Sequence, residues 1–371
     1  METIHGADCW KIGNELVTLA VTREGAHMAP VVFRLGEREV SPYSLSPWKP
    51  DEVDSELPVL LKVLRGDFFC LPFGPQDDGP PHGDPANGEW TEVEVADDRL
   101  VLTMDCSDSG AKLERELKLK SGETAIYYEV RISGLEGDWS YGNHPIIDFS
   151  SLGDGEGFLS VSTFRWGSVY PGVFSDPEKN EFQTLEANGE FVDLQEVPLA
   201  DGGFTDVSRF PSRSGFEDLV MMVNDAATDE QPFAWSAAVL DGYVWFSLKD
   251  PADFPSTLFW LSNGGRKDGP WSGKHVGRVG IEEVCSHFCD RVDDSRVSEL
   301  PAEGIPTTRR FQAEETKSLR IVQAVAGVPE KFGRVASICP DGPGKVVITS
   351  ESGLTVDAAV DWEYAIFKDQ S

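Results

Sequence analysis

The chain is 371 residues long, and 40% of its residues are hydrophobic, which is enough apolar material for a large folded core. It carries 64 acidic against 32 basic side chains, a formal net charge of −32 that disfavours nucleic acid and anionic membrane surfaces as partners. No stretch of about 18 apolar residues is present, so we expect no membrane span. The first residues lack a basic segment followed by an apolar run, which predicts a cytoplasmic protein.

The first half of the chain is predicted to consist of short strands, one helix and one long loop. Acidic residues followed by apolar spacing at 51–64 predict a short helix, and a segment dense in Gly, Pro and Asp at 75–90 predicts a loop. Runs of β-branched or alternating residues predict strands at 16–21, 31–35, 91–96, 100–105, 112–120 and 125–132.

The second half continues this pattern, with a second short helix predicted at 284–292. Strands are predicted at 158–166, 191–194, 219–223, 233–240, 243–248, 256–262, 318–328, 334–338, 345–349 and 355–360. So many short strands predict an all-β protein with one or two short helices. We expect a single β-sandwich domain over 1–371, with a small C-terminal hairpin extension at 340–371 as an open alternative.

The six cysteines are spread too thinly for a disulfide framework. Cys285 and Cys289 flank His287, and this triplet allows a zinc interpretation. However, no second pair of ligands stands at the spacing of a zinc site, so we expect no metal.

The segment from Trp260 to Glu283 combines six glycines with Trp271 and the cations Arg266, Lys267, Lys274 and His275. A loop so rich in glycine buries little apolar surface of its own and must be held by a scaffold, and held loops concentrate functional sites. The segment ends on Glu282 and Glu283. The alternative is a long hairpin connection whose two glutamates form a solvated pair.

Two histidines stand in motifs that favour exposure to a ligand. His82 lies between a proline and a glycine in the long loop, which Trp90 closes. His144 precedes Pro145, which favours an extended backbone and presents the ring from a strand end. The alternatives are a surface histidine at His82 and a core histidine at His144.

These three pieces occur in an order that resembles the aldose 1-epimerase (galactose mutarotase) superfamily: Pro-His-Gly closed by Trp, then Asn-His-Pro, then Gly-Ile-Glu. The resemblance implies a large antiparallel β-supersandwich with a sugar cleft on one face. It implies Glu282 as the catalytic base, His144 as the acid and His82 as a hydrogen-bonding group near the ring oxygen. No cofactor is implied.

The chain also departs from the family pattern. The run after Asn-His-Pro begins Ile146-Ile147, and Glu283 replaces the usual proline. The expected substrate-binding aspartate in mid-chain has no clear counterpart, and Asp206 is the nearest candidate. The resemblance is therefore to a divergent branch, and it does not identify galactose as the sugar.

Further side chains are candidates for substrate contact. Flat aromatic faces suit sugar C–H groups, and guanidinium groups suit hydroxyls or carboxylates. On these grounds we expect substrate contacts from Arg65, Trp90, Asp206, Trp260, Arg266, Trp271 and His275.

The partner expected from these residues is a small-molecule carbohydrate, bound by a monomer or a homodimer. Anomer exchange needs one base and one acid, and a carboxylate and an imidazole suit these roles. Two alternatives remain open. A hexose-phosphate epimerase would use Arg65, Arg266, Lys267 and Lys274 to hold a phosphate, and a carbohydrate-binding protein would keep the cleft without turnover. A glycan-cleaving enzyme is less favoured, because it would need two placed carboxylates.

Overall fold

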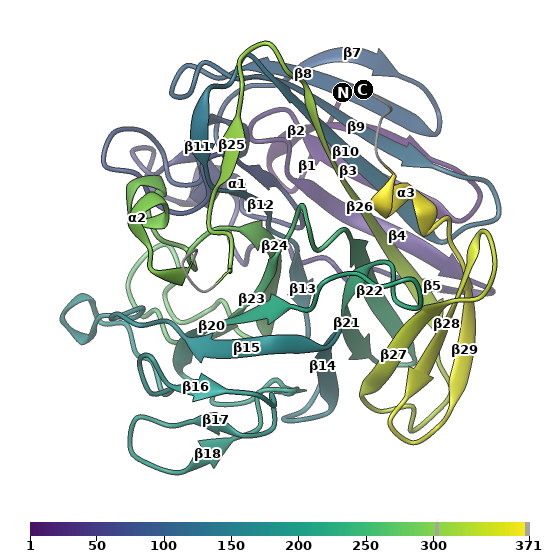
Figure 1. Ribbon diagram of the computed structural model, residues 1–371. Helices are drawn as coiled ribbons and strands as arrows, with labels where there is room; N and C mark the ends of the chain where they lie inside the picture. The colour runs from purple at the N-terminus through teal and green to yellow at the C-terminus, as the bar shows by residue number, and fades with distance from the viewer. Residues whose placement is uncertain (301–303, 368–371) are drawn as a thin grey trace.

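The computed structural model describes residues 1–300 and 304–367, and most of them lie in antiparallel sheets (Figure 1). The largest sheet has nine strands, which in spatial order are β19 (Arg209–Phe210), β14 (Gly157–Val161), β21 (Ala234–Leu240), β22 (Tyr243–Lys249), β26 (Lys317–Gly327), β10 (Ala125–Ser133), β9 (Lys112–Leu119), β8 (Arg99–Asp105) and β7 (Thr91–Val95). The predicted all-β architecture is thereby confirmed.

A second sheet of eight strands carries the site described below. Its main path runs through β16 (Glu190–Phe191), β15 (Phe164–Val169), β20 (Phe216–Asn224), β23 (Ser256–Asn263), β24 (Arg278–Cys285), β12 (Tyr141–Asn143) and β6 (Phe69–Cys70). The eighth strand, β13 (Ile146–Asp148), pairs with β24 beside β12. Strand β24 therefore contacts both segments that flank His144.

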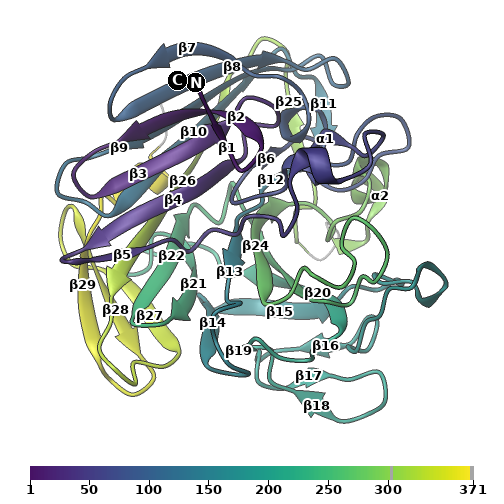
Figure 2. The same ribbon diagram turned by 180° about the vertical axis from the view of Figure 1, so that it is seen from behind.

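The remaining strands form smaller sheets around these two (Figure 2). A five-stranded sheet contains β1 (Glu2–Ile4), β2 (Ala7–Gly13), β3 (Val17–Thr22), β4 (Met28–Leu35) and β5 (Arg38–Val40). Two-stranded sheets pair β11 (Gly137–Trp139) with β25 (Arg309–Phe311), and β17 (Val197–Pro198) with β18 (Phe204–Thr205).

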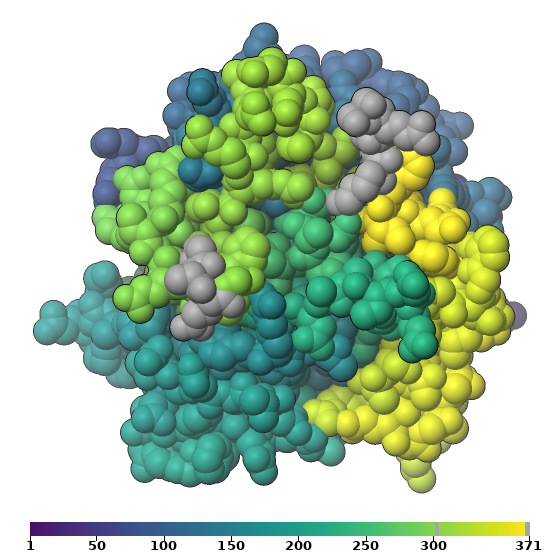
Figure 3. Space-filling model, viewed as in Figure 1, coloured from purple at the N-terminus to yellow at the C-terminus, as the bar shows by residue number. Residues whose placement is uncertain are grey.

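The C-terminal residues form a separate three-stranded sheet of β27 (Val335–Pro340), β28 (Lys345–Ser350) and β29 (Thr355–Ala359). Its apolar side chains pack against the outer face of the nine-stranded sheet, where Val346 and Ile348 join a cluster with Phe246 and Val322. In the space-filling view this part of the chain, in yellow, runs along one side of the molecule (Figure 3).

The described residues contain three short α-helices: α1 (Val59–Val63), α2 (Val292–Val297) and α3 (Glu363–Ile366). Single turns of 3-10 helix occur at η1 (Pro50–Glu52), η2 (Asp84–Ala86) and η3 (Pro177–Lys179). Of the helix predicted over 51–64, only the C-terminal part forms, as α1, because Pro58 interrupts the helix just before it. None of the helices in the described ranges is of a length and apolarity that would cross a membrane.

The helix predicted at 284–292 is wrong in its position. Strand β24 continues to Cys285, which pairs with Tyr141 of β12, and α2 begins only at Val292. The neighbouring strands on both sides satisfy the backbone groups of this segment, and this pairing overrides its local helical pattern.

The main core lies between the nine-stranded sheet on one side and the five- and eight-stranded sheets on the other. It includes Trp245 of β22 together with Val279 and Ile281 of β24. Because side chains of a strand alternate between faces, Glu282 points to the opposite, outer face of the eight-stranded sheet. There Leu258, Trp260 and neighbouring residues form a second apolar cluster, and the candidate site lies within it.

Candidate active site

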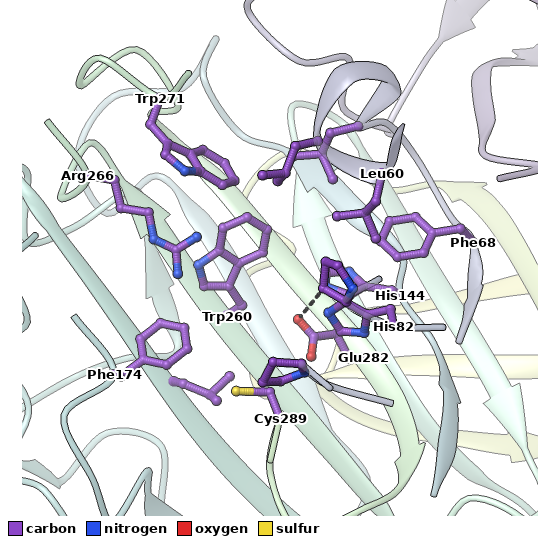
Figure 4. A pocket seen from close by; sticks show the side chains of 15 residues that line it. Leu60, Phe68, His82, His144, Phe174, Trp260, Arg266, Trp271, Glu282 and Cys289 are labelled. Atoms are coloured by element: carbon purple, nitrogen blue, oxygen red, sulfur yellow. Dashed lines mark ion pairs between the residues drawn. The ribbon is translucent and has the colours of Figure 1, made fainter. Parts of the chain in front are cut away.

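A cavity of about 270 Å³ opens on the outer face of the eight-stranded sheet (Figure 4). Strands β20, β23 and β24 form its floor, and α1, the loop after β6 and the glycine-rich segment form its walls. The residues that line it are Leu60, Leu61, Leu64, Phe68, Pro75, Pro81, His82, His144, Phe174, Leu219, Trp260, Arg266, Trp271, Glu282 and Cys289.

A histidine and a carboxylate meet on the floor of the cavity. His144 Nε2 lies 3.2 Å from Glu282 Oε1, and both side chains are buried (Figure 4). Gly280 precedes Glu282 on the same face, and a Cβ there would lie 2.5 Å from Glu282 Oε1 and 3.3 Å from His144 Cε1. The glycine of the Gly-Ile-Glu motif thus leaves the space in which the two side chains meet.

The ring of His144 is fixed from its backbone and from its face. The backbone N–H of His144 donates to Phe68 O at 3.0 Å and lies 3.1 Å from Asp67 Oδ1. The imidazole stacks on Phe68, with ring centroids 4.7 Å apart, and Phe68 in turn stacks on His27 at 4.2 Å. The Nδ1 atom of His144 has no hydrogen-bond partner within the described residues, so stacking rather than a bond to Nδ1 orients the ring.

Burial shifts the protonation of this pair in a defined direction. Desolvation raises the pKa of Glu282 to about 8, because water no longer stabilises its carboxylate. Desolvation also lowers the pKa of His144 well below its usual range, and His82 adds to this effect. At neutral pH the pair therefore holds one proton. These shifts place that proton on Glu282, 3.2 Å from the neutral Nε2 of His144.

His82 stands beside this pair in a restrained loop. Its φ angle is 63°, and its Nδ1 accepts a hydrogen bond from the Gly74 N–H at 3.2 Å. Burial lowers the pKa of His82 to about 4, so the ring is neutral at physiological pH. Since Nδ1 is the acceptor, Nε2 carries the proton and can donate to a ligand.

Asn87 joins the His82 loop to α1. Its Nδ2 donates to Pro81 O and Gly83 O, both at 2.8 Å, and these carbonyls lie on either side of His82. Its Oδ1 accepts from the Leu60 N–H at 3.0 Å. One buried amide therefore fixes two walls of the cavity relative to each other.

The wall opposite α1 is formed by aromatic rings and one guanidinium. The Arg266 guanidinium carbon lies 4.8 Å from the Trp271 ring centroid and 5.4 Å from that of Trp260. Such cation–π contacts hold an arginine without neutralising it. The nearest carboxylate is that of Glu181, 3.7 Å from Arg266 Nε.

Glu217 is an acid near the cavity that the sequence analysis missed. It lies on β20, and its carboxylate accepts hydrogen bonds from Trp260 Nε1 at 2.9 Å, Ser262 Oγ at 3.0 Å and the Gly265 N–H at 3.0 Å. Burial raises its pKa to about 7, an effect that the charge of Arg266 opposes. Glu217 thus fixes the Trp260 indole.

Four residues expected to contact substrate do not line this cavity. Arg65 is buried and donates to Val63 O, Ile4 O and His5 O, so it ties the N-terminal strand to the segment after α1. Trp90 belongs to the main core, and its Nε1 donates to Pro85 O at 2.9 Å. Both positions reflect packing demands that motif order does not reveal.

Asp206 and His275 are also displaced from the cavity. Asp206 lies in the loop between β18 and β19, where its carboxylate accepts from the Ser208 N–H at 2.9 Å. His275 is buried behind the aromatic wall, stacked on Trp260 at 5.2 Å, with Nδ1 2.6 Å from Ser262 Oγ. It supports the wall from behind rather than facing the cavity.

The zinc interpretation finds no support in the described ranges, which contain no metal-binding group of three or more His, Cys, Asp or Glu side chains. The Nδ1 of His287 lies 2.7 Å from Asp290 Oδ2, and Cys285 is buried on the opposite side of β24 from the cavity.

Comparison with known proteins supports the fold. No protein-family model matches the sequence, and a comparison with curated proteins gives no match. Among solved structures, a galactose mutarotase related enzyme of Lactobacillus acidophilus is 10% identical with a TM-score of 0.56, over 87% of this chain and 99% of that chain. A protein of Escherichia coli K12 proposed to be an aldose 1-epimerase is 13% identical with a TM-score of 0.58, over 87% of this chain and 100% of that chain.

A galactose mutarotase-like protein of Lactobacillus casei ATCC 334 is 14% identical with a TM-score of 0.51, over 86% of this chain and 100% of that chain. The chain therefore has the galactose mutarotase-like fold, and the resemblance seen in the motifs is confirmed at the level of the fold.

Proposed function

We propose that this protein is a mutarotase that interconverts the anomers of a monosaccharide or a sugar derivative by acid–base catalysis. The observation that carries the proposal is the buried contact of 3.2 Å between His144 Nε2 and Glu282 Oε1 at the floor of the cavity. A carboxylate and an imidazole that share one proton supply the one base and one acid that the reaction needs.

The proposed mechanism gives each group a role. In the proposed reaction the proton of Glu282 first passes to His144 Nε2. The Glu282 carboxylate then takes the proton from the C1 hydroxyl while His144 gives its proton to the ring oxygen. The C1–O5 bond breaks, and the open chain carries an aldehyde at C1. After rotation about C1–C2 the two residues exchange roles and the ring closes as the other anomer. The Nε2–H of His82 donates to the oxygen that gains negative charge, which lowers the barrier.

The alternative of a sugar-phosphate epimerase is less favoured. It required Arg65, Arg266, Lys267 and Lys274 to converge on one group, and only Arg266 lines the cavity. The Lys267 ammonium donates instead to Gly264 O, and Lys274 is exposed. A single guanidinium in a chain of net charge −32 is a weak receptor for a dianion.

The test is an anomer-exchange assay by polarimetry or saturation-transfer NMR with freshly dissolved aldoses. The wild type should accelerate exchange, and Glu282→Gln should lower kcat by about 10³-fold or more while sugar binding is kept. Glu39→Gln, an exposed glutamate on β5, is the matched control and should keep the wild-type rate. Saturable sugar binding with no exchange of any sugar would instead favour the carbohydrate-binding alternative.

A further inference from the structure

The cavity is poor in groups that can pair with hydroxyls. Among its lining residues, only His82, His144, Glu282 and Arg266 have charged or strongly polar side chains. The first three stand together at one end, where the proposed chemistry at C1 and the ring oxygen uses them (Figure 4). Arg266 and the indole N–H of Trp271, which has no hydrogen-bond partner among the described residues, are then the side-chain donors left for the rest of the sugar.

The α1 wall offers leucine side chains and no spare backbone donors at its start. The N–H of Leu60 donates to Asn87 Oδ1, and the N–H of Leu61 donates to Pro58 O. The carbonyl of Leu61 accepts from Trp48 Nε1 at 2.8 Å, and that of Leu64 accepts from the Ser46 N–H at 3.1 Å. A sugar hydroxyl turned toward this wall therefore meets hydrocarbon.

The opposite side is equally restricted. Leu219 and Phe174 are apolar, and the indole N–H of Trp260 is occupied by Glu217 at 2.9 Å. Burial raises the pKa of the Cys289 thiol well above its usual range, so this lining residue stays an uncharged, weakly polar group. Hydroxyls buried without a partner weaken binding, whereas a methyl or methylene group buried in the same place strengthens it.

We propose that the substrate is a monosaccharide with one apolar edge, namely a deoxy sugar or a sugar whose hydroxyl is capped as an ether. Its methyl, methylene or alkoxy edge lies against the leucines of α1, and one remaining hydroxyl accepts from Arg266. This inference rests on the proposed function for the placement of C1, and it names the class of sugar that the cavity selects.

The test compares matched pairs of sugars in the anomer-exchange assay: D-galactose with 6-deoxy-D-galactose, and D-glucose with 6-deoxy-, 2-deoxy-, 3-O-methyl- and 4-O-methyl-D-glucose. We expect at least one deoxygenated or capped sugar to exceed its parent by about 10- to 100-fold in kcat/KM, the range by which an apolar pocket discriminates against an added hydroxyl. A parent hexose that equals or exceeds all of its derivatives would overturn the inference.

A variant locates the preference on α1. Leu61→Asn places an amide on the wall and should reduce the ratio between the preferred sugar and its parent by about tenfold. Leu354→Asn, at a half-exposed turn of the C-terminal sheet, is the matched control and should leave the ratio unchanged. An unchanged ratio in folded Leu61→Asn contradicts the assignment to this wall.

Binding measurements separate this inference from the proposed function. Titration of the same sugars, followed by the intrinsic tryptophan fluorescence to which Trp260 and Trp271 in the cavity wall contribute, reports preference without turnover. Preferential binding of the apolar-edged sugars without anomer exchange supports the substrate class and overturns the mutarotase. Exchange that favours the parent hexoses supports the mutarotase and overturns the substrate class. Equal binding of all sugars without exchange overturns both the mutarotase and the substrate class.

Discussion

Glu282 and Glu283 are consecutive on β24, yet their surroundings are opposite. Glu283 points into the main core between the two large sheets, where its Oε2 accepts from Lys249 Nζ and from Thr257 Oγ1, the latter at 3.0 Å. Glu282 points into the cavity, where His144 is its partner at 3.2 Å. The two side chains are equally inaccessible, at 2% and 0% exposure. The comparison shows that the partner, rather than the degree of burial, distinguishes a carboxylate in a buried ion pair from one whose pKa is raised beside a neutral imidazole.

The burial of both side chains also contradicts the interpretation of the two glutamates as a solvated pair. Strand alternation sends them to opposite faces of a sheet that is covered on both sides. The core-facing glutamate is balanced by an ammonium group, and the cavity-facing glutamate is left with a neutral imidazole, so burial raises its pKa.

The largest expected effect comes from removing the partner of Glu283. Lys249→Met would leave a buried carboxylate without its cation, and the free energy of unfolding should fall by about 3–5 kcal/mol. Denaturant unfolding measures this loss. The double variant Lys249→Met with Glu283→Leu should recover most of the stability, because both charges are then absent. A single variant within about 1 kcal/mol of the wild type would contradict the structural role of the pair.

Removing the carboxylate of Glu282 should increase the stability of the protein at alkaline pH, whereas Lys249→Met decreases it. The pKa of Glu282 is raised to about 8 in the folded state, so the unfolded chain ionises first and stability falls between the unfolded pKa, near 4.3, and about 8. Glu282→Gln removes this loss. Its free energy of unfolding relative to the wild type should rise by roughly 4 kcal/mol between pH 5 and pH 8.5.

Thermal or denaturant unfolding at several pH values measures that difference, with Glu39→Gln as the exposed control. A difference that stays constant across this range would show that the carboxyl group is not held protonated.

The pH dependence of catalysis sharpens the same contrast. The proposed reaction would use the one proton of the His144–Glu282 pair, and that proton is lost as the pH rises through about 8. The value of kcat/KM should therefore fall above about pH 8, by up to tenfold per pH unit. The profile is measured with a sugar whose own ionisation lies outside the range. A rate that keeps rising to pH 9.5 would mean that a deprotonated pair is the active form.

The smallest expected effect concerns Asn87, a buried amide whose oxygen and nitrogen both have hydrogen-bond partners. Asn87→Ala removes the hydrogen bonds to Pro81 O, Gly83 O and the Leu60 N–H, which should cost about 1–3 kcal/mol of stability. Because these bonds hold the His82 loop, kcat should fall by roughly tenfold with a smaller change in KM. Asn87→Asp keeps the oxygen that accepts from the Leu60 N–H but loses both donated bonds, so it tests the donated bonds alone. An unchanged kcat in a stably folded Asn87→Ala would leave Asn87 with a purely structural role.

The motifs located part of the site because they combine local backbone chemistry with order along the chain. His82, His144, Glu282, Arg266 and Trp271 all line the cavity. A residue before proline is held in an extended backbone, and glycines allow the chain to pass close to a cavity, so both kinds of motif indicate side chains that a scaffold holds in place.

The remaining candidates failed for a physical reason that is specific to each. Arg65 donates hydrogen bonds to backbone carbonyls, and Trp90 packs in the main core, as large apolar side chains commonly do. Glu217 was overlooked because the predicted strand began at Leu219, which left the acid outside any predicted strand. In the structure β20 begins at Phe216, and the wall of the cavity satisfies the carboxylate.

The sequence by itself determined the all-β class, the order of the three motifs and the short strands that carry them, since alternation and turn residues act locally. Only the tertiary structure decided what each of the two adjacent glutamates contacts, which cations reach the cavity and how apolar its walls are. Those choices depend on strand register and on the packing of one sheet against another. A shift of one residue in register reverses every side chain of a strand, and contacts distant in sequence fix that register.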